Sequence, residues 1–350
     1  MWIKKLLLII LVLCSVCQAA QVIRYVDPDA PGPAHDGTSW NDAYLSLSAW
    51  NTAEETDLDT ANNYMTVYCR SSSGTNDTTN FTMFGWITSA TDYIEIIGAD
   101  FPADGIWDDT KYILENATSN GTTITMQESY VRFVNMQFLN KAPDGTNTIY
   151  ISQVGTSDIR FDSCIFKADF SAVAATLSSG LRVNDATATV KVYNCVFYGF
   201  IEGADADFRA VWADNQSSLT LYNCTIYGNN KGIDQDAGTC AAYNCAVGNN
   251  TDDFVDTITI DYCCSDGGEG TNAQTPSGGA WANEFTAPGS DFSLLVGGNC
   301  VGNGTDNPGA GLYSDDIIGT ARTTTWDIGA FEYDAGAPAS TGQVIMIQEF

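Results

Sequence analysis

The stretch Val192-Tyr-Asn-Cys-Val-Phe197 recurs along the chain, and this repeat decides the fold. Each copy has six positions in this order: an apolar residue, a polar residue or Tyr, an Asn or Ser, a Cys, any residue, and an apolar residue. The other copies are Phe161-Asp-Ser-Cys-Ile-Phe166, Leu221-Tyr-Asn-Cys-Thr-Ile226, Ala242-Tyr-Asn-Cys-Ala-Val247, the Met-containing Phe133-Val-Asn-Met-Gln-Phe138 and the decayed Ile260-Asp-Tyr-Cys263. Copies spaced by roughly 20 to 30 residues are typical of stacked solenoid coils whose loops vary in length.

A second short segment precedes the copies of this repeat. It is rich in β-branched and aromatic residues and is bounded by turn formers, as strands are. The segments are Tyr112–Glu115, Thr148–Ser152, Gly180–Asn184, Arg209–Ala213 and Lys231–Asp234. We expect no amphipathic helix after residue 60. Many short strands at one roughly constant period predict an all-β fold, a parallel β-helix whose coils lie about 4.8 Å apart.

Stacked coils explain why Asn and Cys are adjacent. The four Asn side chains occupy one turn in successive coils, where we expect their amides to form a hydrogen-bonded ladder. These residues are Asn135, Asn194, Asn223 and Asn244. The residues Cys164, Cys195, Cys224 and Cys245 then point inward as a stack of small apolar side chains. Free thiols that fill the core are the favoured interpretation, and one or two disulfides remain the alternative.

The first 19 residues have the pattern of a secretory signal peptide. Lys4 and Lys5 precede an apolar run, which ends in small residues up to Ala19. This run is too short to span a bilayer, and no later run is apolar enough to do so. We therefore expect a secreted or cell-surface protein. Its cap covers 20–60, its β-helix with a closing region covers 61–333, and a linker with a final β-strand covers 334–350.

Within the cap, a strand at Val22–Val26 is followed by turn formers and then by an expected helix. Ser39 and Asp42 resemble a capping box, so we expect the helix to begin there. Trp40, Tyr44, Leu47 and Trp50 recur at helical spacing and predict one apolar face that covers the core.

The charge balance excludes two classes of partner. The chain has 14 Lys and Arg against 43 Asp and Glu, a formal net charge of -29. Such a field repels phosphate backbones and anionic membrane surfaces, so nucleic acid is not expected as a partner. Because 44% of residues are hydrophobic and only 16% are charged, the chain can bury a large core.

Two stretches outside the repeats point to a known group of proteins. Arg24–Tyr44 resembles the N-terminal cap of secreted bacterial right-handed parallel β-helix proteins of the pectate-lyase-like superfamily, and 291–333 resembles their closing region. Where relatives carry Ser-Pro-x-Ile-Asp-x-Gly, this chain has Gly298–Gly304, so we expect its final coil to close differently. The resemblance implies a right-handed β-helix but no single activity, because the superfamily includes lyases, hydrolases and adhesins.

Polysaccharide lyases of this superfamily use a cation such as Ca²⁺ to neutralise a uronate carboxylate and an Arg or Lys as base. The candidate bases here are Arg182, Arg209 and Lys231. The candidate Ca²⁺ ligands are Asp205, Asp207, Asp214, Asp234 and Asp236. Alignment on the Asn-Cys pair also predicts that Asp185 and Asp214 share one position in neighbouring coils. The alternative interpretation is a solvated acidic face.

Other catalytic sites are poorly supported. Polygalacturonases of this fold carry Gly-His-Gly, but the one histidine, His35, lies in the N-terminal turn region, so a hydrolase of that type or a Ser-His-Asp triad is not expected. Tyr193, Tyr222 and Tyr243 precede their Asn residues and predict either an outward row that stacks on sugars or simple packing between coils.

These observations favour an extracellular or cell-surface β-helix protein with a structural, adhesive or glycan-binding role. The apolar segment Gln343–Glu349 is a β-strand candidate that either caps its own solenoid or adds to an exposed edge of a second copy, giving self-association. The alternative function is a Ca²⁺-dependent lyase that acts on uronate-containing polysaccharide.

Overall fold

The computed structural model describes residues 19–116, 121–141, 146–152, 155, 157–170, 177–201, 207–215, 218–323 and 325–333. The expected signal peptide up to residue 18, the linker and the final strand at 334–350, and Asp205 lie outside this part. Within it, no helix is long and apolar enough to cross a membrane.

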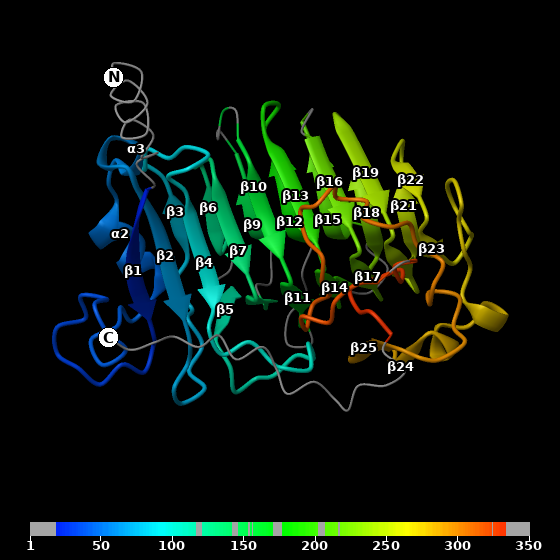
Figure 1. The fold of residues 1–350 in the computed structure, drawn as a ribbon, viewed down its shortest axis with the longest axis horizontal. Coiled ribbons are helices and arrows are strands. Elements are labelled where there is room, and N and C mark those ends of the chain that lie inside the picture. Colours follow the sequence, from blue (N-terminus) through cyan, green and yellow to red (C-terminus); the bar gives the residue numbers. More distant parts are fainter. Residues whose placement is uncertain are drawn as a thin grey trace, which may run out of the picture.

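The described chain coils into a right-handed solenoid with three parallel sheets, which Figure 1 shows from the side. Sheet 1 contains, in spatial order, β1 (Ala20–Val26), β2 (Asn63–Cys69), β4 (Ile94–Gly98), β7 (Val131–Val134), β10 (Ile159–Asp162), β13 (Thr189–Tyr193), β16 (Ser218–Tyr222), β19 (Thr239–Tyr243) and β22 (Thr259–Asp261). Sheet 2 contains β5 (Ile113–Asn116), β8 (Gln137–Asn140), β11 (Ile165–Ala168), β14 (Val196–Tyr198), β17 (Thr225–Tyr227), β20 (Ala246–Gly248) and β23 (Cys264–Ser265).

Sheet 3 contains β3 (Phe81–Met83), β6 (Ile124–Met126), β9 (Thr146–Ile151), β12 (Ser178–Asn184), β15 (Phe208–Asp214), β18 (Lys231–Gln235) and β21 (Asp252–Val255). From β7 to β21, each coil gives one strand to each sheet, so the predicted all-β parallel β-helix is confirmed. Of the five short strand segments that were expected before the copies of the repeat, four lie in sheet 3. Tyr112–Glu115 is the exception, because β5 pairs with β8 in sheet 2.

The Asn-Cys copies lie one above another. Phe133, Phe161 and Val192 are direct partners in neighbouring strands of sheet 1, and the same register continues to Ile260. In each copy, the residue directly after the sheet 1 strand has a left-handed backbone. Its φ lies between 45° and 54° at residues 135, 163, 194, 223, 244 and 262. Asn is favoured there because its short polar side chain tolerates this conformation. The turn between sheets 1 and 2 therefore explains the Asn.

The Asn amides do not form the continuous ladder that was expected. One rung exists, in which Asn244 Nδ2 donates to Asn223 Oδ1 at 3.3 Å. The amides also donate sideways to backbone carbonyls of the closing segment, which we define as residues 304–333. Asn194 Nδ2 donates to the Asp315 carbonyl at 2.9 Å, and Asn223 Nδ2 donates to the Asp327 carbonyl at 2.7 Å. The turn thus binds a distant part of the chain.

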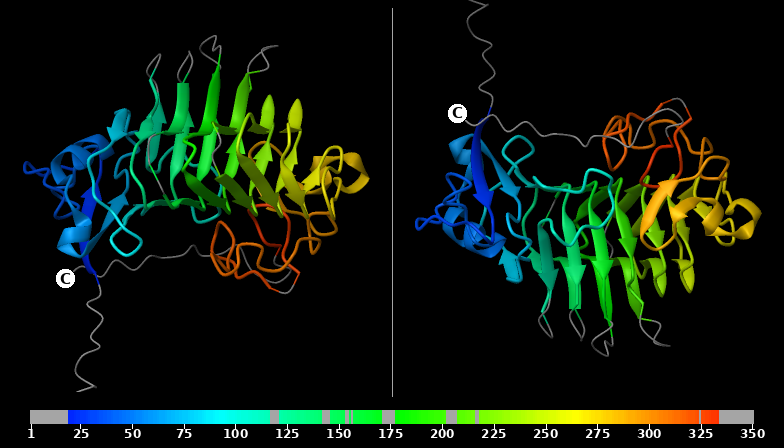
Figure 2. Two further views of the ribbon diagram at one scale, coloured as in Figure 1. Left: turned by 90° about the horizontal axis from the view of Figure 1, so that it is seen from above. Right: turned by 90° about the horizontal axis from the view of Figure 1, so that it is seen from below.

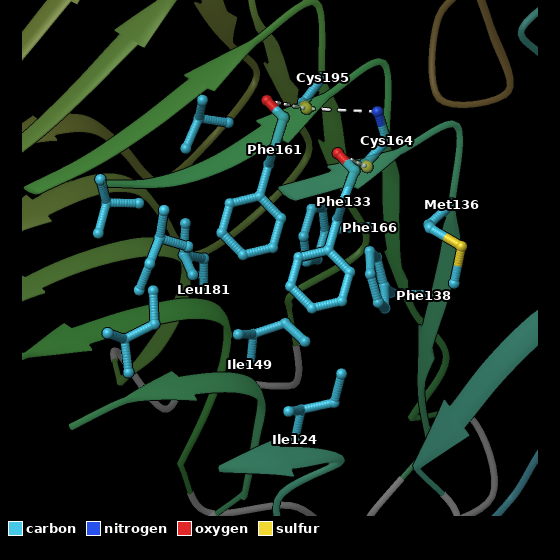
Figure 3. Close-up of a cluster of buried hydrophobic side chains, with 14 of the residues drawn as sticks. Ile124, Phe133, Met136, Phe138, Ile149, Phe161, Cys164, Phe166, Leu181 and Cys195 are labelled. Atoms are coloured by element: carbon cyan, nitrogen blue, oxygen red, sulfur yellow. Dashed lines mark hydrogen bonds between the residues drawn. The ribbon is translucent and has the colours of Figure 1, made fainter. Parts of the chain in front are cut away.

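Aromatic rings and thiols fill the solenoid (Figure 3). Phe133 stacks on Phe161 with ring centroids 5.1 Å apart, and Phe166 stacks on Phe197 at 4.4 Å. The stacked residues Cys164, Cys195, Cys224 and Cys245 are buried free thiols, as are the other cysteines of the described residues. Burial raises the pKa of the Cys195 and Cys224 thiols well above the ordinary value, which keeps them protonated and unreactive.

One end of the solenoid is covered by α2 (Leu47–Glu54), followed by α3 (Leu58–Ala61). The expected helix start at Ser39 is wrong. The N-cap is Ser46, whose Oγ accepts the Ala49 N–H at 3.0 Å. Residues before it cannot be helical because the Tyr44 N–H donates to the Tyr25 carbonyl at 2.9 Å, which ties this stretch to β1.

The closing region, orange and red in both views of Figure 2, lies along one side of the solenoid and packs on strands of sheet 2 and on the Asn turns. Two 3-10 turns, η1 (Ser277–Gly279) and η2 (Trp281–Asn283), precede an antiparallel hairpin of β24 (Phe285–Ala287) and β25 (Asp291–Leu294). This hairpin joins an apolar cluster with residues of sheet 2. The closing segment then runs along the Asn turns, where the buried Arg322 binds Asn194 Oδ1 at 3.0 Å.

The closing segment also covers the predicted tyrosine row. Tyr313 stacks on Tyr193 with centroids 5.1 Å apart, and its hydroxyl donates to Asn223 Oδ1 at 2.6 Å. Tyr222 and Tyr243 stack on each other at 5.6 Å. Tyr193 is therefore packed internally and does not present a free ring to sugars, whereas Tyr222 and Tyr243 stay half-buried.

Candidate functional site

Sheet 3 presents a row of functional side chains away from the core. Tyr150, Arg182, Trp212 and Asp234 are direct partners on β9, β12, β15 and β18. Their immediate neighbours Ile149, Leu181, Val211 and Ile233 belong to the buried core. Because side chains alternate across a strand, the first four residues form an outward row across successive coils. We call Tyr150, Arg182, Trp212 and Asp234 the sheet 3 row.

Two guanidinium groups contact the indole of Trp212. Arg182 Cζ lies 3.9 Å from the Trp212 ring centroid, and Arg209 Cζ lies 4.1 Å from it. Arg182 also lies 5.2 Å from the Tyr150 ring. Cation–π contacts of this kind fix the planes of both partners and limit their rotamers. The aromatic and basic residues of the row are thus one packed unit.

Each candidate base is bound by a carboxylate. Arg182 Nη2 lies 2.8 Å from Asp214 Oδ2. Arg209 Nε and Lys231 Nζ both bind Asp234 Oδ2, at 2.5 Å and 2.9 Å. Arg209 Nη2 also lies 3.4 Å from Asp207 Oδ1. A base that abstracts a proton needs a free lone pair, whereas each of these groups is engaged in an ion pair with a carboxylate.

A group of three carboxylates lies beside these pairs. Asp234, Asp236 and Asp256 each offer one oxygen, and the three oxygens lie within 4.8 Å of one another. Asp234 is fully buried, and its Oδ1 has no hydrogen-bond partner among the residues that the structure describes, whereas Asp236 and Asp256 are exposed. A buried carboxylate oxygen without a donor is costly, and a cation is one partner that would offset this cost.

The chemistry of this group fits Ca²⁺. Ca²⁺ takes carboxylate oxygens at 2.3–2.6 Å, so two oxygens that share one ion lie at most about 5 Å apart. The three oxygens satisfy this limit. The full burial of Asp234, whose Oδ1 has no partner among the described residues, distinguishes this group from an ordinary acidic surface. A residue outside the group also orients Asp236, because Trp212 Nε1 donates to Asp236 Oδ2 at 2.9 Å.

The structure brings most of the predicted site residues together. Arg182, Arg209, Lys231, Asp214, Asp234 and Asp236 lie on or beside three neighbouring strands, and Asp207 contacts Arg209. One expected alignment is wrong, since Asp214 faces Asn184 rather than Asp185. The Asn-Cys pair fixes the register of sheet 1, but the chain between sheets 3 and 1 varies in length and shifts the register of sheet 3.

Sequence reasoning missed Asp256 and Trp212. Asp256 follows β21, the last strand of sheet 3, where the repeat has decayed and no strand was expected. In the structure, Val255 is the sheet partner of Asp234, and Asp256 comes directly after Val255. This register places Asp256 beside Asp234. Trp212 was read only as a strand residue, since nothing in the sequence shows that its indole contacts Asp236.

Comparisons with known proteins give little further guidance. No family model matches the chain, and no curated protein matches its sequence. Among solved structures, it is similar to the crystal structure of pectate lyase Pel9A, at 14% sequence identity and a TM-score of 0.37. This match covers 90% of this chain and 97% of that chain. The fold assignment rests on the three parallel sheets described above.

Proposed function

We propose that this protein is an extracellular or cell-surface β-helix protein that binds a uronate-containing polysaccharide through the sheet 3 row, with Ca²⁺ at Asp234, Asp236 and Asp256. This role is structural or adhesive. The observation that carries the proposal is the group of three carboxylates around Asp234, a fully buried residue whose Oδ1 has no donor among the described residues.

The net charge explains why a cation belongs in this proposal. With a formal charge of -29, the chain repels a polyuronate unless positive charge lies between them. Ca²⁺ supplies that charge when bound, because it accepts oxygens from protein and ligand together. Asp234, Asp236 and Asp256 would hold the ion, and Arg182 next to Trp212 gives a planar donor group for sugar carboxylates.

The ion pairs favour binding over cleavage. Arg182, Arg209 and Lys231 each form an ion pair with a carboxylate, so each of these candidate bases already has a partner within the protein. The alternative, a Ca²⁺-dependent lyase, draws on the same residues, because Lys231 lies beside the acidic group. The two functions differ in product, since a lyase leaves unsaturated sugar ends that absorb in the ultraviolet.

Polygalacturonate and the full-length protein test the proposal. We expect binding in millimolar CaCl₂ that is lost in EDTA, and no ultraviolet absorbance from new unsaturated ends. Asp234→Asn should abolish the binding, whereas Asp185→Asn, a nearby acid outside the group, should keep it. Equal binding in EDTA would contradict the cation site, and growing absorbance would replace the binding role with the lyase.

Self-association through Gln343–Glu349 remains a sequence-based part of the proposal. The apolar, β-prone character of this segment supports strand addition to a second copy. Light scattering of the full chain and of a chain ending at 342 tests it. We expect the full chain to be larger than a monomer and the shortened chain to be monomeric. Monomers in both samples would exclude the idea.

A further inference from the structure

We infer that Trp212 is a positioning residue that couples the cation group to the sheet 3 row. The inference rests on the proposed function, because it assigns Trp212 a role toward Ca²⁺ and polyuronate at that same site. Its basis is that one indole contacts a carboxylate of the cation group through its N–H and two guanidinium groups through its ring.

The first step concerns Asp236. Its carboxylate is exposed, and an exposed Asp side chain samples several rotamers unless a partner selects one. Trp212 Nε1 donates to Asp236 Oδ2 at 2.9 Å and thereby selects one orientation. Partners that orient metal-binding carboxylates are worth about 10- to 100-fold in metal affinity.

The second step concerns how Trp212 is itself held. Its side chain is only 8% exposed although it points away from the core. Arg209 contacts the ring at 4.1 Å and binds Asp234 Oδ2 at 2.5 Å, so the indole is linked to a second carboxylate of the group. A displaced indole would therefore disturb both Asp236 and Asp234.

The third step concerns the ligand side. Arg182 Cζ lies 3.9 Å from the centroid of the same ring, and its guanidinium is paired with Asp214. A sugar carboxylate bound at this part of the row would compete with Asp214 for that guanidinium. Movement of Arg182 toward a ligand changes its contact with Trp212. The affinities for Ca²⁺ and polyuronate should then depend on each other, by the same factor in both directions.

Trp212→Phe tests this role because it keeps an aromatic ring and removes the N–H donor. We expect its Ca²⁺ affinity, measured calorimetrically, to fall about 10- to 100-fold. Trp107→Phe is the matched control, since Trp107 Nε1 also donates to a carboxylate, Asp109 Oδ1 at 2.7 Å, far from this site in the sequence. Its Ca²⁺ affinity should equal that of the wild type.

Thermal melting of Trp212→Phe in EDTA separates a positioning role from a contribution to stability. If Trp212 were merely structural, the substitution would lower the melting temperature and leave the Ca²⁺ affinity unchanged. Wild-type protein gives a second readout that needs no variant to fold. Its indole N–H resonances should include one, from Trp212, that moves on Ca²⁺ saturation and again on polygalacturonate addition, while that of Trp107 stays fixed.

The outcomes distinguish the two proposals. If the wild type binds no Ca²⁺, the proposed function fails and this inference fails with it. If the wild type binds Ca²⁺ and Trp212→Phe binds it equally, or if no indole resonance moves on saturation, the coupling role alone is overturned.

Discussion

Asn223 shows how one residue serves both the repeat and the closing region. Its backbone is left-handed, with φ of 45°, which lets the chain turn from sheet 1 to sheet 2. Its amide donates to the Asp327 carbonyl at 2.7 Å, and its Oδ1 accepts the Tyr313 hydroxyl at 2.6 Å. The backbone conformation is a property of the coil, whereas the side-chain bonds connect the coil to residues about 100 positions away.

Two substitutions separate these contributions. Asn223→Ala should lower the free energy of unfolding by about 3 kcal/mol, because it adds strain at positive φ to the lost hydrogen bonds. Asn223→Gly should cost only about 1–2 kcal/mol, since glycine adopts this backbone freely and loses only the bonds. Urea denaturation measures both. A cost for Ala no greater than that for Gly would show that the left-handed turn is not strained.

Glu128 gives the stability a pH dependence. It is buried, its Oε1 accepts the Trp86 N–H at 2.9 Å, and burial raises its pKa from the ordinary value of 4.5 to about 7. In the unfolded chain the carboxyl ionises near 4.5, but in the folded protein it ionises only near 7. The unfolded state therefore binds fewer protons between these values, and stability falls as pH rises through this window.

We therefore expect the melting temperature to fall between pH 5 and pH 7, and Glu128→Gln to reduce the slope while its amide oxygen still accepts the Trp86 N–H. Calorimetric scans across this range measure the effect. The contribution of Glu128 is on the order of 2–3 kcal/mol. An identical slope in the variant would assign the pH dependence to other carboxyl groups.

The closing segment is the element that the sequence described least well. The sheet 1 coils could be predicted because Phe161 and Val192 occupy equivalent positions of a repeat and become neighbours by periodicity alone. The contact of Tyr313 with Tyr193 joins a repeated residue to a unique one, and no period specifies it. The tyrosine row therefore had two interpretations that only the fold could separate.

Arg322 is the buried anchor of this element. Its side chain is fully buried, pairs with Glu332 at 3.1 Å and donates to Asn194 Oδ1 at 3.0 Å. Arg322→Met should cost about 3–5 kcal/mol, because it leaves the charge of Glu332 without its cationic partner. Limited proteolysis should then cut within the closing segment before the solenoid.

Lys141→Met is the control for this prediction. Its pair with Glu115 spans 3.3 Å, and the Lys141 side chain is 41% exposed, so the loss should be at most about 1 kcal/mol. Equal losses in the two variants, or cleavage that begins in the coils, would show that Arg322 does not hold the closing segment in place.

At the scale of the molecule, the solenoid brings dispersed residues into one site. Arg182, Trp212 and Asp234 are far apart in sequence, but each lies one coil from the next. Once the repeat was recognised, the sequence could predict which strands bring these candidate residues together. It could not predict which carboxylate oxygen lacks a donor, because that depends on how Arg209 and Lys231 share Asp234 Oδ2.

Calorimetric titration of Ca²⁺ into the full-length protein, alongside Asp234→Asn, tests the cation group most directly. The account predicts that the wild type binds one ion per chain at this group and that the variant loses this binding while its circular dichroism spectrum stays that of a β-helix. A folded wild type that takes up no Ca²⁺, or a variant that binds it unchanged, would contradict the account.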